Sequence, residues 1–258
     1  MEQKTIFITG ASRGIGKSIA LLFASRGYHT FLNCSSSVDE LKKLRAYITE
    51  KYHTPCTLVP GNVGNPDHVR AIYNKIYQEC THLDVLVNNA GISYINLLTD
   101  MTDEDWNRII QTNLSSVFYC CRQAIPPMVS KRSGKIINIS SMNAYTPLTK
   151  IPAYSGAKAA VSNFTEWLAV HFSKSRIRVN GIAPGFFATK QNRELLFEKD
   201  GTPTPRTGKI LAATPLGRFG ESEELIGTLL FLLNNEASGF ITGVVIPVDG
   251  GFQAYSGV

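Results

Sequence analysis

The chain has few cysteines and no long apolar run. Its 258 residues include five cysteines, an odd number with no CxxC pair, which argues against a disulfide framework. We therefore expect reduced, mostly buried thiols in a cytoplasmic protein. No apolar run approaches the roughly 20 residues that a membrane-spanning helix needs. Because few residues precede the first predicted strand, we expect no signal peptide.

Charge and histidine are too dispersed to mark a nucleic-acid or a metal site. The net charge is +6, but the basic residues are scattered, so no nucleic-acid partner is predicted. The five histidines show no HxxxH or Cys/His clustering, so no metal is expected. The mild positive charge suits a phosphorylated cofactor or an acidic substrate, or it is only a solvated surface.

Short β-branched runs alternate with stretches of helical period along the whole chain. This alternation predicts a single α/β domain over residues 1–258, a Rossmann-type doubly wound parallel sheet of about seven strands. Thr102 is expected to cap one long helix that runs towards Met128. The strands expected are Thr5–Thr9, His29–Asn33, Thr57–Pro60, Val85–Asn88, Lys135–Ile139, Ile177–Ile182 and Val244–Val248.

A glycine-rich turn follows the first predicted strand, in the segment Thr9–Gly16 (TGASRGIG). Such a turn lets the backbone approach a pyrophosphate, and the next helix offers free N–H groups and a positive dipole end. Gly16-Lys17-Ser18 is similar to the end of a P-loop, GxxxxGK[ST]. Five residues rather than four separate Gly10 from Gly16, so a nucleoside triphosphatase is rejected.

The spacing TGxxxGxG, together with four further motifs, resembles the short-chain dehydrogenase/reductase family. The motifs are Asn88-Asn89-Ala90-Gly91, Asn113 in the long helix, Ser141 after the fifth strand, Tyr154-x-x-x-Lys158, and Pro184-Gly185 after the sixth strand. The resemblance covers nearly the whole chain. It implies an NAD(P)(H)-dependent oxidoreductase that interconverts a small-molecule ketone and a secondary alcohol. It also implies a homotetramer, which the apolar last strand favours.

Tyr154 and Lys158 lie four residues apart on a predicted helix, so their side chains share one face. A nearby ammonium favours the phenolate, and we expect it to bring the pKa of Tyr154 closer to neutral for general acid–base work. Ser141, 13 residues upstream, is placed to hold the substrate oxygen. The resemblance implies that Asn113 completes a catalytic tetrad and orders water for Lys158. Considered without the other motifs, Tyr154 and Lys158 could instead be surface residues of an amphipathic helix.

The resemblance also implies which residues contact the dinucleotide. Lys158 would contact the nicotinamide ribose and Thr189 the carboxamide, while Asn62 occupies the place of an acid that faces adenine in the family. The other implied contacts are Gly10, Ser12, Arg13, Gly14, Ile15, Gly16, Cys34, Ser35, Ser36, Val63, Asn89, Ala90, Gly91, Tyr154, Pro184 and Gly185.

The end of the second predicted strand bears on the choice of cofactor. Cys34 stands where NAD-preferring folds place an Asp or Glu for the ribose 2′-hydroxyl, and no acid occurs before Asp39. The serines after Cys34 offer neutral donors, and Arg13 offers a cationic fork to a 2′-phosphate. We therefore predict NADP(H). NAD(H) remains possible if these are only solvated turn residues.

The two halves of the chain resemble different branches of the family. The second half, in residues 143–154, 184–193 and 248–258, is similar to D-mannonate oxidoreductases (fructuronate reductases), whereas residues 11–16 and 112–118 look like 3-oxoacyl carrier-protein reductases. The long segment at about residues 186–214 is predicted to be a substrate lid. Because the lid belongs to the second half, we expect a small polar keto or sugar acid such as fructuronate.

The candidate substrate contacts are Asn143, Gln191, Asn192 and Arg193, although the last three could equally face water. A 3-oxoacyl thioester is the alternative substrate. A catalytically silent dinucleotide-binding protein is a remote alternative, because such proteins usually lose the Tyr or the Lys.

Overall fold

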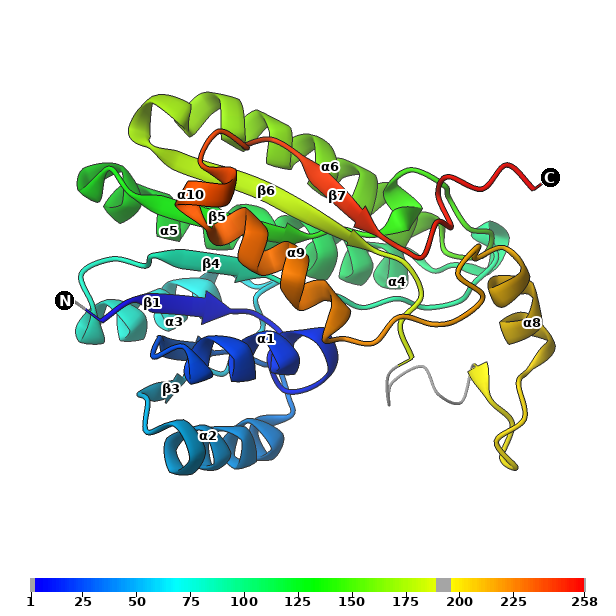
Figure 1. Cartoon of the computed structure of the whole chain (residues 1–258), viewed down its shortest axis with the longest axis horizontal. Helices are drawn as coiled ribbons and strands as arrows, with labels where there is room; N and C mark the ends of the chain where they lie inside the picture. The colour runs from blue at the N-terminus through cyan, green and yellow to red at the C-terminus, as the bar shows by residue number, and fades with distance from the viewer. Residues whose placement is uncertain (1–2, 189–195, 258) are drawn as a thin grey trace.

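The computed structural model describes residues 3–188 and 196–257. In this part of the chain seven parallel strands form one sheet in the order β3-β2-β1-β4-β5-β6-β7, with helices on both faces (Figure 1). The predicted doubly wound α/β fold is confirmed. The strands are β1 (Thr5–Ile8), β2 (His29–Leu32), β3 (Cys56–Leu58), β4 (Val85–Asn88), β5 (Gly134–Ile139), β6 (Ile177–Pro184) and β7 (Val245–Val248).

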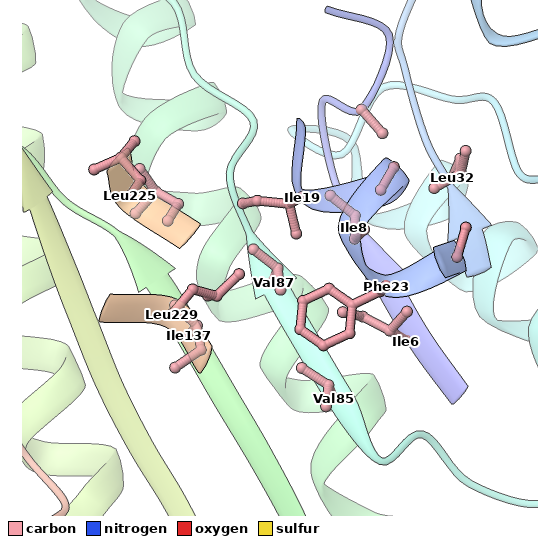
Figure 2. Packing of buried hydrophobic residues seen from close by; sticks show 14 of the residues in the cluster. Ile6, Ile8, Ile19, Phe23, Leu32, Val85, Val87, Ile137, Leu225 and Leu229 are labelled. Carbon is pink, nitrogen blue, oxygen red and sulfur yellow. The ribbon is translucent and has the colours of Figure 1, made fainter. Parts of the chain in front are cut away.

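Side chains alternate between two apolar cores, one on each face of the sheet. Ile6 and Ile8 of β1 enter the core beneath α1, α2 and α9, whereas Phe7 enters the core beneath α3, α5 and α6, as the period of a strand requires. Figure 2 shows the first core, where Phe23 of α1 and Leu229 of α9 lie over the strands. The helices are α1 (Gly14–Ser25), α2 (Val38–Tyr52), α3 (Pro66–Glu79), α4 (Asp103–Ile110), α5 (Ser116–Lys131), α6 (Pro152–Phe172), α8 (Pro205–Ala212), α9 (Glu224–Leu233) and α10 (Asn235–Ser238).

The long helix predicted to run from Thr102 towards Met128 contains one irregular turn. Thr102 does cap α4, since its side chain accepts a hydrogen bond from the Asp105 N–H. A π-helical turn, η2 (Gln111–Ser115), joins α4 to α5, so the long helix is present but one of its turns is not α-helical. Short 3₁₀ turns form η1 (Leu98–Asp100), η3 (Met142–Ala144) and η4 (Ser173–Ser175).

The five cysteines carry free thiols, and Cys34, Cys120 and Cys121 are buried. This agrees with the expectation of reduced thiols that pack as small apolar groups. Among the described residues, none of the helices is both long enough and apolar enough to span a bilayer.

Candidate active site

The predicted motifs gather at one edge of the sheet, where the parallel strands end. The strand order reverses direction between β1 and β4, and in open α/β sheets ligands bind beyond the carboxyl ends of the strands at such a point. The glycine-rich turn follows β1, Asn89–Gly91 follow β4, and Ser140 and Ser141 follow β5. These three segments form the walls of the candidate site.

A cavity of about 690 Å³ opens between the glycine-rich turn, the end of β2 and the segment after β4. Among the described residues that line it there is no Asp or Glu, which suits an anionic ligand. The predicted residues that line it are Gly10, Ser12, Arg13, Gly14, Ile15, Cys34, Ser35, Ser36, Asn62, Val63, Asn89, Ala90 and Gly91.

Gly16 is required by close packing and does not line the cavity. A Cβ at this position would lie 2.4 Å from Gly10 O and 2.6 Å from Asn89 Nδ2. Asn89 Nδ2 itself donates to Thr9 O (2.9 Å) and Gly10 O (3.1 Å). Asn89 therefore links the β4 end to the glycine-rich turn, and any side chain at Gly16 would separate the two walls.

The wall formed by the end of β2 is neutral. Cys34 is buried, and burial raises the pKa of its thiol, so it carries no charge near neutral pH. Asn33 donates to Val59 O (2.9 Å) and Gly61 O (3.0 Å), which fixes the loop after β3 against this strand. No described side chain here would repel a second phosphate.

Asn113 lies fully buried in the π-helical turn. Its Nδ2 donates to Ile92 O (2.8 Å) and Ile109 O (2.9 Å), and its Oδ1 accepts from Ile92 N (3.3 Å). A Cβ on Gly91 would lie 2.7 Å from Asn113 Oδ1 and 3.8 Å from Lys158 Nζ. Asn113 and Lys158 therefore approach each other across Gly91, as the predicted tetrad requires.

Ser141, Tyr154 and Lys158 come together where β5 meets α6. Lys158 Nζ donates to Ile139 O (2.7 Å) and lies 5.6 Å from the centre of the Tyr154 ring. The lysine is buried, and burial lowers its pKa to about 8. Ser140, the rival of Ser141, contacts instead Ser162 Oγ (2.8 Å) and Lys158 O (3.2 Å).

The pKa of Tyr154 differs in direction from the expectation. Burial raises it above the usual value for a phenol, and a hydrogen bond from Ser141 lowers it by less. The cost of burying a phenolate therefore outweighs its stabilising contacts. Tyr154 is thus protonated in the absence of ligands, which suits a proton donor.

Several lining residues were missed by the sequence argument. They are Asn33, Ser37, Gly61, Ile92, Tyr94, Arg108 and Thr112. The guanidinium of Arg108 lies 4.8 Å from the Tyr94 ring centre and donates to its hydroxyl. Within the described ranges, no carboxylate forms an ion pair with Arg108. The sequence signal that could have identified Arg108 is its position in the same predicted helix as Asn113, five residues before it.

Four of the predicted contacts, Thr189, Gln191, Asn192 and Arg193, lie outside the described residues. Pro184 ends β6, and Gly185 N donates to Val248 O (3.0 Å) beside the sheet edge; neither is among the residues that line the cavity. In the described ranges no group of three His, Cys, Asp or Glu side chains is arranged to hold a metal ion.

Comparisons with known proteins agree with this geometry. A family model described as short chain dehydrogenase matches residues 4–200. An uncharacterized oxidoreductase of Haemophilus influenzae is 49% identical over 214 residues, which are 76% of this chain and 75% of that protein. The 3-oxoacyl-[acyl-carrier-protein] reductase of Staphylococcus aureus is 36% identical over 96% of this chain and 97% of its own length.

Solved structures show the same architecture with either dinucleotide. A Haemophilus influenzae protein, provisionally named a D-mannonate oxidoreductase and solved with bound NAD, superposes with a TM-score of 0.92 at 41% identity, covering 100% of this chain and 98% of its own. L-sorbose reductase of Gluconobacter frateurii, solved with NADPH and L-sorbose, gives 0.89 at 31% identity, with coverage of 99% and 98%.

Proposed function

The chain belongs to the short chain dehydrogenase family of oxidoreductases, and from this premise we propose that it interconverts the ketone and the secondary alcohol of a small polar keto or sugar acid with NADP(H). The observation that carries the proposal is the convergence of Asn113, Ser141, Tyr154 and Lys158 beside a cavity without acidic lining. A catalytically silent protein would not need a buried lysine at this place.

The residues present fit a dinucleotide. Helix α1 has no side-chain cap at its start, so its first N–H groups are available to a pyrophosphate. Ser12, Gly14 and Ile15 would hold that group. Lys158 would hold the nicotinamide ribose.

Preference for NADP(H) is proposed on the neutral end of β2 and on Arg13, which lines the same cavity. Measuring kcat/KM for both cofactors on one substrate tests it, and a ratio that favours NADH contradicts it. Arg13→Ala is expected to weaken NADPH binding by about 1.5–3 kcal/mol, the range for a hydrogen bond to a charged group, and to leave NADH nearly unchanged. The matched control is Arg26→Ala, outside the cavity.

When bound, the nicotinamide supplies the hydride or accepts it. Ser141 would hold the substrate oxygen while Tyr154 gives that oxygen a proton. The raised pKa of Tyr154 keeps its phenol protonated and therefore able to donate. The ammonium of Lys158 would stabilise the phenolate that remains. Asn113 has both side-chain amide hydrogens engaged, so its side chain could hold a relay water only through Oδ1, as an acceptor.

A carboxylate on the substrate is proposed because Arg108 stands on the cavity wall without a carboxylate partner among the described residues. Tyr94, which Arg108 contacts, lies in the same cavity lining as Gly91, and a Cβ on Gly91 would lie 3.8 Å from Lys158 Nζ. The provisional name of the Haemophilus influenzae neighbour supports a sugar acid. The Staphylococcus aureus relative favours a second candidate, a 3-oxoacyl thioester.

The test is turnover of both cofactors with fructuronate, a neutral ketose and a 3-oxoacyl thioester. The proposal expects the highest kcat/KM with the keto acid, and Arg108→Met is expected to raise KM for the acid but not for the neutral ketose. Preference for the thioester would select the second candidate. No turnover of any carbonyl compound would refute the proposed function.

The predicted tetramer and lid are also proposals. An apolar groove of about 800 Å³ lies between α5 and α6, where Phe118 and Trp167 are 44% and 54% exposed. Val244, next to β7, and Phe231, on α9, are each 38% exposed. Exposed apolar side chains of this kind are what a tetramer with twofold axes would cover. The lid, at about residues 186–214, is proposed to close the site.

A further inference from the structure

The hydroxyl of Ser141 receives two hydrogen bonds from one neighbour. Asn143 donates to Ser141 Oγ from its backbone N–H (3.2 Å) and from its side-chain Nδ2 (3.1 Å). A serine hydroxyl has two acceptor lone pairs and one hydrogen. Both lone pairs are therefore occupied, and the hydrogen of Ser141 must be donated to another group.

The orientation of the Asn143 amide follows from a third contact. Leu148 N lies 3.2 Å from Asn143 Oδ1. A backbone N–H only donates, so the atom that faces it must be the oxygen, and Nδ2 must face Ser141. Asn143 is 7% exposed, so water competes little for either bond. The amide is held at both ends by the turn that follows β5.

The remaining hydrogen of Ser141 is available to Tyr154. Both lone pairs of Ser141 Oγ accept from Asn143, so Ser141 can only donate when it bonds to the Tyr154 hydroxyl. Such a bond favours the phenolate and lowers the pKa of Tyr154, against the larger effect of burial. Thus Asn143, Ser141 and Tyr154 form one directed series of hydrogen bonds that ends at the reacting oxygen atoms.

We propose that Asn143 is a positioning residue that makes Ser141 an obligatory hydrogen-bond donor to the reacting oxygens. The inference rests on the proposed function, since it assigns Ser141 and Tyr154 to the reaction. In reduction, the donor would favour the negative charge that develops on the substrate oxygen. In oxidation, it would stabilise the Tyr154 phenolate that takes the proton. The role differs from the direct substrate contact expected from the sequence.

Asn143→Asp is the informative variant because it keeps the size and the oxygen that accepts from Leu148. It replaces the Nδ2 donor with an acceptor, which draws the Ser141 hydrogen away from Tyr154. We expect kcat to fall about 10–100-fold, the factor that corresponds to one hydrogen bond to a charged group, with cofactor affinity unchanged. The pH profile for alcohol oxidation is expected to move to higher pH. The control Asn74→Asp, an exposed position on α3, should change neither.

A double-mutant cycle with Ser141→Ala separates the proposal from a direct contact. If Asn143 acts through Ser141, then Asn143→Asp costs little more in the Ser141→Ala background. If Asn143 binds substrate directly, the loss of kcat/KM persists at full size in that background, and the proposal is overturned. Should the Asp variant unfold, Asn143→Ala carries the same cycle with a smaller expected loss.

A readout independent of turnover distinguishes failure of this inference from failure of the proposed function. Tyrosinate absorbance, taken as the difference between each protein and its Tyr154→Phe counterpart, reports the pKa of Tyr154. Asn143→Asp is expected to raise that pKa more in the Ser141 background than in the Ser141→Ala background, where only the added charge acts. Equal shifts in the two backgrounds overturn the inference even if the enzyme is active.

Discussion

Removing the charge of Lys158 should stabilise the ligand-free protein in a pH-dependent way. Burial lowers the pKa of Lys158 from 10.5 to about 8, and one pKa unit corresponds to about 1.4 kcal/mol. The folded protein at pH 7 therefore carries a cost of about 3 kcal/mol for the buried ammonium. Lys158→Met removes this cost, whereas the unpaired Ile139 carbonyl adds about 1–3 kcal/mol that does not vary with pH.

The sign follows from the two proton affinities. Between pH 8 and 10.5 the unfolded chain holds the lysine proton and the folded chain has released it, so the free energy of unfolding rises with pH. The cost in the wild type should fall from about 3 kcal/mol at pH 7 to about 1 kcal/mol at pH 10. Other titratable groups contribute equally to the free energy of unfolding of wild type and Lys158→Met, so their contributions cancel in the difference.

The assay is urea unfolding of both ligand-free proteins at one protein concentration, followed by fluorescence of the two tryptophans, at pH 7, 8, 9 and 10. From pH 7 to pH 10 the free energy of unfolding of the wild type is expected to rise by about 2 kcal/mol relative to that of the variant. A difference that stays constant with pH, or that moves in favour of the variant, would refute the assignment of a buried ammonium. Loss of turnover in Lys158→Met at every pH is expected as well.

Three further predictions concern the proposed proton donor, the glycine-rich turn and the apolar groove. Tyr154→Phe should lower turnover about 10²–10⁴-fold and leave cofactor affinity, measured by fluorescence titration, unchanged; retention of a tenth of the activity contradicts the assignment. Gly16→Ala should cost about 1–3 kcal/mol of stability and weaken cofactor binding, because its methyl group would meet Gly10 O at 2.4 Å. The control Gly227→Ala, with open space around it, should do neither. Trp167→Glu should dissociate the oligomer in light scattering, and an unchanged mass would remove the groove between α5 and α6 from the proposed interface.

The sequence was sufficient where the signal is local. The strands are short β-branched runs, and the glycine-rich turn and the Tyr154/Lys158 pair are each recognisable within a few residues, so their elements and approximate positions were predicted. Sequence spacing could not show that Asn143 is bonded to both Ser141 and Leu148, because that depends on the path of one turn. Nor could it show Arg108 against Tyr94, which lie on separate segments. The direction of the Tyr154 pKa shift was misjudged because burial, a tertiary property, outweighs the hydrogen bond with Ser141.

The π-helical turn at residues 111–115 has a consequence for engineering. There the Ser116 N–H reaches back to Gln111 O, and the Asn113 amide donates to Ile109 O within the same stretch. One extra residue in a turn rotates everything after it by about 100° relative to a regular helix. A redesign that replaces the π turn with regular α-helix would make α4 and α5 one regular helix. It would also rotate the Asn113 side chain away from Ile92, with which it now exchanges two hydrogen bonds. A more regular helix would therefore be gained only by losing the buried position of the Asn113 amide. A mutant library built for thermal stability should keep residues 111–115 unchanged.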